Sequence, residues 1–191
     1  EKNPEADVEG HDACRKIAIL WSLVLGKRVD FEDIYTEGIT KITTADFAYA
    51  NKLNWEIKLL ASGWKKDGEI YAMVAPALVK SGNPLHAVSD VFNAILVHGN
   101  MVDDVMFYGR GAGKDATASA VVGDVVEAAK NPGKTIYEGW TEEKYNLSDI
   151  KTAVRRFLVR VNNEDLEAAK AAFACEELME GVVEGETGIL T

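Results

Sequence analysis

The dipeptide Asp67-Gly68 predicts a tight turn in the first half of the chain. It closes the segment Lys65-Lys66-Asp67-Gly68, which lies between two runs of strand-forming residues, 56–64 and 69–74. Asp-Gly flanked by such runs is a strong hairpin signal, because both residues tolerate the positive φ that a two-residue hairpin turn needs. We therefore expect two antiparallel strands joined here, against which the neighbouring segments must pack.

Helical and strand patterns follow one another around this hairpin. An apolar run from Ile17 to Leu25 stops at Gly26, and Thr43 with Asp46 has capping-box spacing before a helix over about 44–53. After a connection rich in turn-forming residues at 76–84, the sequence predicts strands at 89–97 and 102–108. The order favours an α+β fold with a mixed, largely antiparallel sheet covered by helices on one face.

The remaining segments predict a helix and a small C-terminal unit. A helical pattern covers 117–130, and turn-rich residues at 131–146 indicate a linker or an extended wrap. Patterns of strand (156–161), helix (163–173), strand (178–184) and strand (188–191) then give a β-α-β-β order. A unit this small cannot form a robust core alone, so we expect it to dock on the main domain or on a second subunit.

Composition excludes several classes of protein. The chain has 191 residues, with 31 acidic against 21 basic side chains and a net charge of −10, which disfavours binding to nucleic-acid backbones or anionic membranes. It contains neither a membrane-spanning apolar run nor a signal-peptide pattern. The two cysteines, Cys14 and Cys175, are far apart, which fits a reducing cytoplasm better than a disulfide scaffold. The first residue is not Met, which suggests a piece of a longer protein.

Charged residues are concentrated at the start of the chain. Asp12 is placed to cap the helix that contains Ile17–Leu25, and Lys16 follows four residues later on the same face. One interpretation is ordinary capping and a solvated ion pair. The other is a site in which carboxylates and one ammonium hold an amino-acid-like ligand and move a proton. Gly10 favours the second, since glycine before a helix indicates positive φ or a close backbone approach.

A glycine-rich segment, Gly109-Arg-Gly-Ala-Gly113, stands between a predicted strand and a predicted helix. It allows two interpretations, a turn that requires positive φ or a loop that approaches a phosphate or a cofactor closely. Its spacing differs from the dinucleotide-binding fingerprint, and Asn131-Pro-Gly stands where an acidic residue would end the next strand. The histidines, His11, His86 and His98, are scattered, and no cluster has the spacing of metal ligands, so no metal site is predicted.

The residues from Asn3 to Lys16, NPEADVEGHDACRK, resemble the signature of homoserine dehydrogenases without a departure. Two further segments, Gly38–Thr43 and Met106–Gly113, are also similar to that family, and the resemblance runs from Glu1 to about Lys130. It implies a catalytic and dimerisation domain at 1–150 and a short ACT-like module at 151–191. It also implies that a nucleotide-binding half precedes Glu1, and that this chain alone binds NAD(P) weakly and turns over negligibly.

The resemblance also implies an activity and residue roles. Homoserine dehydrogenases interconvert L-aspartate 4-semialdehyde and L-homoserine with NADPH or NADH, and a cytoplasmic homodimer is expected. Lys16 would exchange the proton with the substrate oxygen, and Asp7 would orient or tune Lys16. Glu1 and Asp12 would hold the substrate. Gly113 would contact the nicotinamide end of the cofactor. The alternative is a non-catalytic dimerisation or amino-acid-sensing module, which would not need the Asp12/Lys16 pair.

Overall fold

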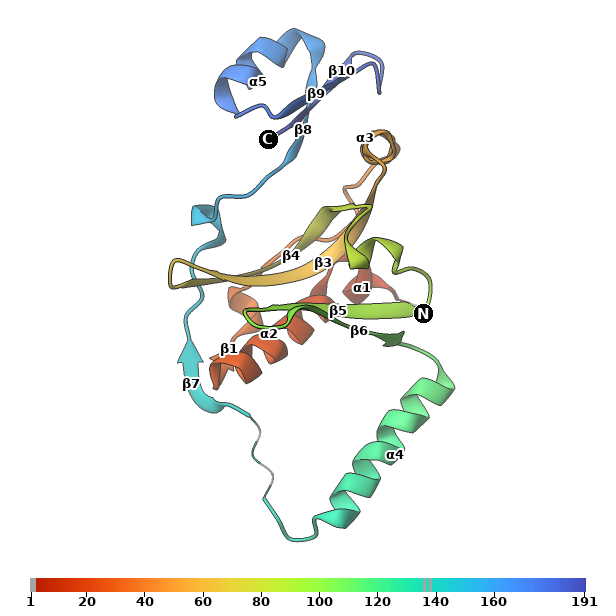
Figure 1. Cartoon of the computed structure of the whole chain (residues 1–191), viewed down its shortest axis with the longest axis vertical. Helices are drawn as coiled ribbons and strands as arrows, with labels where there is room; N and C mark the ends of the chain where they lie inside the picture. Colours follow the sequence, from red (N-terminus) through yellow and green to blue (C-terminus); the bar gives the residue numbers. More distant parts are fainter. Residues whose placement is uncertain (1–2, 136, 138) are drawn as a thin grey trace. The chain divides into compact units, whose positions relative to one another are not determined.

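The computed structural model describes residues 3–135, 137 and 139–191 (Figure 1). Contacts along the chain divide it into two compact units. The first consists of Glu1–Leu78 with Gly139–Thr191, and the second of Val79–Glu138. Glu1 lies outside the described residues.

The first unit begins with two helices, α1 (Glu5–Val8) and α2 (His11–Leu25). Strand β1 (Lys27–Val29) and the short β2 (Tyr35–Thr36) follow, and then α3 (Thr44–Leu53), whose capping box of Thr43 and Asp46 is present as predicted. The long strands β3 (Trp55–Lys66) and β4 (Glu69–Lys80) follow, and the last two residues of β4 already belong to the second unit (Figure 1).

The predicted first hairpin is confirmed. Strands β3 and β4 are neighbours, and they are joined by Asp67 and Gly68 with φ values of 52° and 87°. Strand β2 pairs with the other edge of β4 in a parallel sense, through Tyr35↔Met73 and Thr36↔Val74, so the three-stranded sheet is mixed. The sheet order is β2-β4-β3.

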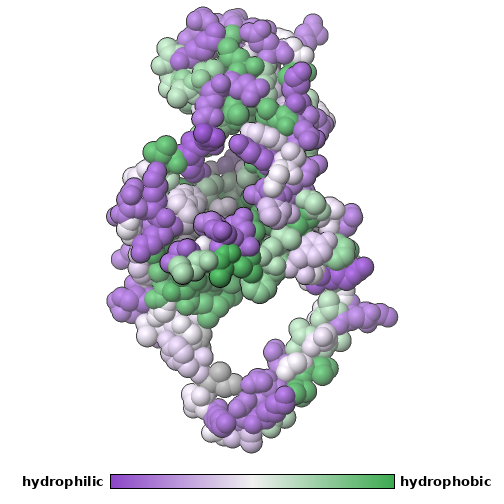
Figure 2. All heavy atoms as spheres, in the orientation of Figure 1, coloured by the Kyte–Doolittle hydropathy of each residue, from purple (hydrophilic) through white to green (hydrophobic). Residues whose placement is uncertain are grey.

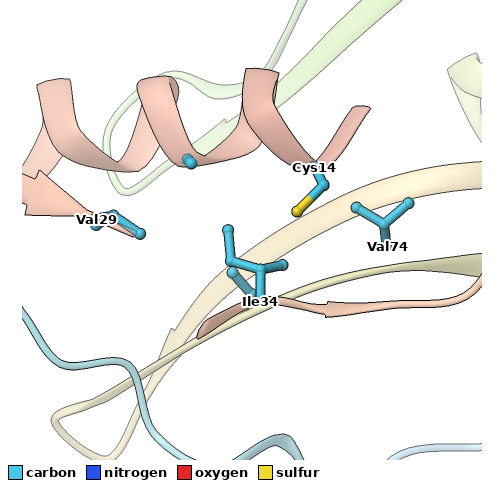
Figure 3. Packing of buried hydrophobic residues seen from close by; sticks show 6 residues of the cluster. Cys14, Val29, Ile34 and Val74 are labelled. Atoms are coloured by element: carbon cyan, nitrogen blue, oxygen red, sulfur yellow. The ribbon is translucent and has the colours of Figure 1, made fainter. Parts of the chain in front are cut away.

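One face of α2 packs on this sheet and forms the main core. Cys14 and Ala18 of α2 lie against buried side chains of the strands and of the segment before β2, namely Val29, Ile34, Ala72 and Val74 (Figure 3). Val74 is completely buried, and burial of a side chain of this size stabilises a fold by about 1.5–3 kcal/mol. The spacing of four residues between Cys14 and Ala18 is the period expected of a helix face that covers a sheet.

A buried serine connects α2 to β1. The Ser22 hydroxyl donates a hydrogen bond to the Ala18 carbonyl at 2.8 Å, and it accepts one from the Val29 N–H at 2.9 Å. Both partners are backbone groups, so the one polar residue on this buried face is fully satisfied. The turn between α2 and β1 is closed by Gly26, which ends the helix at φ 65°.

The chain returns to the first unit at β7 (Thr141–Tyr145), which pairs in parallel with β1. Strand β8 (Leu158–Asn162), helix α5 (Leu166–Ala172), β9 (Glu177–Glu180) and β10 (Glu186–Leu190) then confirm the β-α-β-β order. The three strands form an antiparallel sheet in the order β8-β10-β9. The expected division into domains at 1–150 and 151–191 stays a prediction.

The second unit contains the predicted second hairpin and helix. Strands β5 (Phe92–Gly99) and β6 (Asp103–Arg110) pair in an antiparallel sense from Phe92↔Arg110 to Gly99↔Asp103. Helix α4 (Lys114–Lys130) follows the glycine-rich turn. Figure 2 shows hydrophobic side chains on the surface of α4, where four exposed valines are located, Val121, Val122, Val125 and Val126.

The α+β class is confirmed, and in the described residues the strands are distributed over four small sheets. Three local predictions were wrong. Asp12 does not cap α2, because the helix begins at His11 with Gly10 as its N-cap residue. Residues 76–80 belong to β4 rather than to a connection. Pro76 is tolerated in this strand because it lies beyond Val74, the last residue paired with β2, so its missing N–H removes no hydrogen bond to β2. Of the two interpretations of 131–146, the linker is wrong, because part of this segment is the paired, extended strand β7. In the described part of the chain, no helix is long and apolar enough to cross a membrane.

Candidate functional site

Gly10 sets the junction between α1 and α2. Its φ of 79° is left-handed, and a Cβ at this position would lie 2.8 Å from Val74 Cγ1 and 3.4 Å from Thr36 Cγ2. The residue is buried, so the helix start sits directly on the sheet. Both explanations predicted for this glycine, positive φ and close approach, therefore hold, and they explain why the helix begins there and not at Asp12.

The Gly38–Thr43 segment supports the same junction from the other side. A Cβ on Gly38 would lie 2.5 Å from the Cα of Glu9, so only glycine permits this approach of two backbones. The Ile39 N–H donates to the Val8 carbonyl at 2.8 Å. The segment ends at Thr43, where α3 begins. Two stretches that resemble one family in sequence are therefore in contact in space.

Asp12 and Lys16 form an ion pair in the first turns of α2. The Lys16 Nζ lies 2.6 Å from Asp12 Oδ2, with side-chain exposures of 67% and 46%. At this exposure an i,i+4 pair contributes only about 0.3–0.5 kcal/mol to stability. Its charged atoms are accessible to a ligand, and the acidic residue in the first turn also complements the helix dipole.

The other predicted substrate residues differ in what the structure describes. Asp7 is exposed on α1, and its carbonyl accepts the N–H of Gly10 at 3.1 Å. It is five positions from Asp12, which lies on the other side of the left-handed turn at Gly10. The predicted role of Glu1 cannot be placed, because that residue lies outside the described part.

Gly113 belongs to the second unit and is the N-cap residue of α4. Its φ of 114° requires glycine, and a Cβ there would meet no atom within 4 Å. No side chain of the described residues caps this helix, so its first N–H groups are not occupied by a capping oxygen. The positive φ confirms the turn interpretation, and the open backbone face leaves the cofactor interpretation as a prediction.

A small pocket opens beside the site, on a face of α2 that the sequence analysis did not single out. It has a volume of about 200 Å³ and is lined by two segments, residues of α2 (His11, Cys14, Arg15) and residues 31–36 (Phe31, Glu32, Ile34, Thr36). The Arg15 guanidinium lies 5.7 Å from the Phe31 ring centroid, and the buried Cys14 thiol donates to the Phe31 carbonyl at 3.3 Å. Cys14 therefore has a packing role.

A cluster of charged side chains around Arg160 in the first unit was also missed. Arg160 of β8 donates to Asp46 Oδ1 at 2.8 Å and binds both carboxylate oxygens of Glu186 at 2.8–3.0 Å. Burial works against it, but hydrogen bonds from Arg160 and Thr43 hold the pKa of Asp46 below its ordinary value. Hydrogen bonds to Asp46 and Glu186 raise the pKa of Arg160. A pattern-based search cannot find this cluster, because its members are far apart in the sequence.

Among the described residues, no group of His, Cys, Asp and Glu side chains could hold a metal ion. His98 is paired with Asp104, Nδ1 to Oδ1 at 2.8 Å, across the β5–β6 hairpin. Both side chains are exposed, as expected for a surface pair.

Comparison with known proteins gives a consistent result. A family model described as homoserine dehydrogenase matches residues 1–126. The chain is similar to homoserine dehydrogenase of Mycobacterium leprae, with 42% identity over 205 aligned positions that cover 96% of this chain and 46% of the relative. The crystal structure of S. aureus homoserine dehydrogenase at pH 7.5 superposes with a TM-score of 0.77 and 33% identity, over 100% of this chain and 49% of that one.

A mutant of a hyperthermophilic archaeal homoserine dehydrogenase, solved in complex with NADPH, is more distant. It has a TM-score of 0.52 and 28% identity, over 71% of this chain and 38% of that one. The chain thus spans about half the length, or less, of the proteins it matches.

Proposed function

The chain belongs to the homoserine dehydrogenase family, and on that premise we propose that it supplies the substrate-binding and proton-transferring part of an NAD(P)-dependent oxidoreductase. The reaction would interconvert L-aspartate 4-semialdehyde and L-homoserine. The observation that carries the proposal is the accessible Asp12–Lys16 pair at 2.6 Å, at the start of a helix whose approach matches the family signature.

Lys16 would move the proton. When the aldehyde carbon of the substrate accepts hydride, its oxygen becomes an alkoxide that needs one proton, and the Lys16 ammonium would donate it. In the reverse direction, the neutral amine would take the proton back. Proton transfer by a positioned side chain contributes about 100- to 10,000-fold to the rate. An ammonium also stabilises the developing negative charge, which adds to its suitability.

Asp12 would hold the amino end of the same substrate, together with Glu1. A carboxylate accepts several hydrogen bonds, so Asp12 can hold Lys16 through one contact and the substrate ammonium through another. The role of Glu1 rests on the resemblance in sequence alone. Asp7 would orient or tune Lys16 from α1 without touching the substrate.

The cofactor would be NADPH or NADH, which supplies the hydride when it is bound. The open backbone at Gly113 and the uncapped first turn of α4 are compatible with the approach of its nicotinamide end. Most of the binding energy for the nucleotide would come from the part of the longer relatives that this chain does not match. We therefore expect negligible turnover from the 191 residues alone.

Substitution of Lys16 in the chain extended to full family length tests the assignment. Lys16→Ala should lower kcat/KM for aspartate 4-semialdehyde by about 100- to 10,000-fold with an unchanged circular dichroism spectrum. Lys27→Ala is the matched control, because Lys27 forms an ion pair of the same length, 2.6 Å, with Glu143. Equal activity of the Lys16 variant and the wild type would leave the alternative, a non-catalytic dimerisation or amino-acid-sensing module.

The assembly would be a homodimer through the β5–β6 hairpin. Ile95 is opposite Phe107 and Val97 is opposite Val105, so these four side chains share one face of the hairpin. They are 39–64% exposed, which is unusual for a continuous apolar face of a protein that acts alone. A cytoplasmic location is proposed with it, on the two unpaired cysteines, Cys14 and Cys175.

Sedimentation tests the dimer. The wild type should sediment as a dimer at tens of micromolar, and Phe107→Glu should shift it towards a monomer, because the charge would be buried unpaired in the contact. Val154→Glu is the control, since Val154 is 87% exposed in another part of the chain. A wild type that stays monomeric counts against the proposed contact.

A further inference from the structure

Arg160 connects the C-terminal strands to α3 through charge-assisted hydrogen bonds. Arg160 lies on β8, and its guanidinium reaches across to Glu186 of β10 and to Asp46 in the first turn of α3. The side-chain exposures of Arg160, Asp46 and Glu186 are only 22–27%. Three hydrogen bonds to Glu186 and one to Asp46 use the fixed fork of the guanidinium, which a lysine does not have.

Packing supports the same connection. Tyr49 of α3 is completely buried, and a Cβ on Gly188 of β10 would lie 2.6 Å from its ring. The Arg160 guanidinium lies 5.9 Å from the centroid of this ring. In residues 151–191 only Ala169, Met179, Thr187, Gly188 and Ile189 are buried. This number of core residues is too small to stabilise an independent unit. The C-terminal strands therefore depend on α3 for their stability.

Arg160 contacts the N-terminal end of α3, which directly follows the Gly38–Thr43 segment. Asp46 Oδ2 accepts the Thr43 N–H at 2.7 Å, and Arg160 also donates to the Thr43 hydroxyl at 3.1 Å. Thr43 is the last residue of the Gly38–Thr43 segment, which contacts Val8 and Glu9 at its other end. A continuous series of hydrogen bonds and backbone contacts thus leads from Arg160 to the approach of α2.

We propose that Arg160 is a positioning residue through which the C-terminal strands hold the Gly38–Thr43 segment against Val8 and Glu9, directly before α2, and that this contact sets how tightly the site binds the substrate. The inference rests on the proposed function for the identity of that substrate. The device acts at a distance, since Arg160 touches neither Asp12 nor Lys16 in the described contacts. Loss of the Arg160 contacts with Asp46 and Glu186 should therefore weaken substrate binding more than proton transfer.

Steady-state kinetics of the chain extended to full family length tests the functional half. Arg160→Ala should raise KM for aspartate 4-semialdehyde about three- to tenfold and change kcat by less than about twofold, the pattern of lost uniform binding. Arg160→Lys keeps the charge and loses the fork, so it should recover part of the change. Arg156→Ala is the matched control, because Arg156 pairs with Glu176 at 2.8 Å within the C-terminal part. Equal effects of the Arg160 and Arg156 variants, or a fall in kcat alone, would overturn the proposal.

Amide hydrogen exchange in the 191-residue chain gives a readout that does not depend on activity. The Ile39 N–H donates a hydrogen bond to the Val8 carbonyl. Its exchange rate should rise about tenfold in Arg160→Ala and should stay unchanged in Arg156→Ala. An unchanged exchange rate of the Ile39 N–H in both variants would refute the claim that Arg160 holds the Gly38–Thr43 segment in place. An extended wild type without dehydrogenase activity would refute the proposed function instead, and the exchange rates would still decide whether Arg160 holds the segment.

Discussion

Replacement of Gly10 by alanine separates the two demands that the structure places on this residue. The backbone must adopt φ 79°, and the position of a Cβ is already occupied by the Val74 side chain. Each demand has its own energetic cost. Another glycine in the same unit, Gly26, meets only the first, with φ 65° and no atom within 4 Å of a Cβ.

The expected loss follows from these two terms. An alanine in the left-handed region costs about 1 kcal/mol more than a glycine. A Cβ 2.8 Å from Val74 Cγ1 adds an overpacking cost of about 1–3 kcal/mol. Val74 is completely buried between α2 and the sheet, so its methyl groups cannot rotate into solvent. Gly10→Ala should therefore lower the free energy of unfolding by about 2–4 kcal/mol, and Gly26→Ala by about 1 kcal/mol.

Urea unfolding followed by tryptophan fluorescence measures both variants in the relevant unit. All four tryptophans, Trp21, Trp55, Trp64 and Trp140, belong to the first unit, so the signal reports its unfolding and not that of the second. The same denaturant dependence in both variants would show that the comparison concerns stability and not a changed unfolded state.

A double variant identifies the contact. Val74→Ala removes the methyl group that a Cβ at position 10 would meet, so Gly10→Ala should cost less in that background than in the wild type. Equal losses in Gly10→Ala and Gly26→Ala, with no coupling to Val74, would refute the claim that the start of α2 rests on the sheet at this point.

Three further changes have defined outcomes. Because the pKa of Asp46 is lowered in the fold from 3.8, its contribution to stability is present above pH 4 and is lost as the pH falls below that; urea unfolding at pH 6 and pH 3 should show Asp46→Asn approaching the wild type at the lower pH. Gly188→Ala should destabilise the first unit by about 1–3 kcal/mol, since its Cβ would meet the buried Tyr49 ring; an unchanged urea midpoint would contradict that packing. Gly123→Ala, in α4 with no atom near a Cβ, should raise the helical circular dichroism signal at intermediate temperatures, because the helix gains about 0.5–1 kcal/mol; a loss of helix would show that the position is not open.

Elements with a local signal were predictable from the sequence. The Asp67-Gly68 turn adopts the positive φ values that its residue types favour, and the Thr43/Asp46 capping box starts α3 where its spacing indicates. The β5–β6 hairpin and the glycine turn before α4 follow the same rule. In each case the residues that determine the structure are within a few positions of one another, so their pattern survives in a single sequence.

Structure that depends on distant partners was not predictable. Strand β7 is stabilised by parallel pairing with β1, and the ion pair between Lys27 and Glu143 joins residues 116 positions apart. Pro76 suggested a break, but it is accommodated in β4 beyond the last pair with β2. The Arg160 cluster likewise brings together residues 114 and 26 positions apart. None of these arrangements leaves a periodic or spaced signal.

The candidate site combines both kinds of information. Its charged residues, Asp12 and Lys16, are adjacent on one helix face and were found by spacing, whereas the position of that helix depends on Gly10 beneath Val74 and on Gly38 against Glu9. Capping propensity favoured Asp12 as the N-cap residue, and tertiary packing moved the N-cap two residues earlier, to Gly10. A weak local preference of about 1 kcal/mol yields to the burial of a whole helix face. It follows that variants of the supporting glycines and of Arg160 should change substrate binding through the position of α2, while variants of Lys16 should change the proton transfer itself.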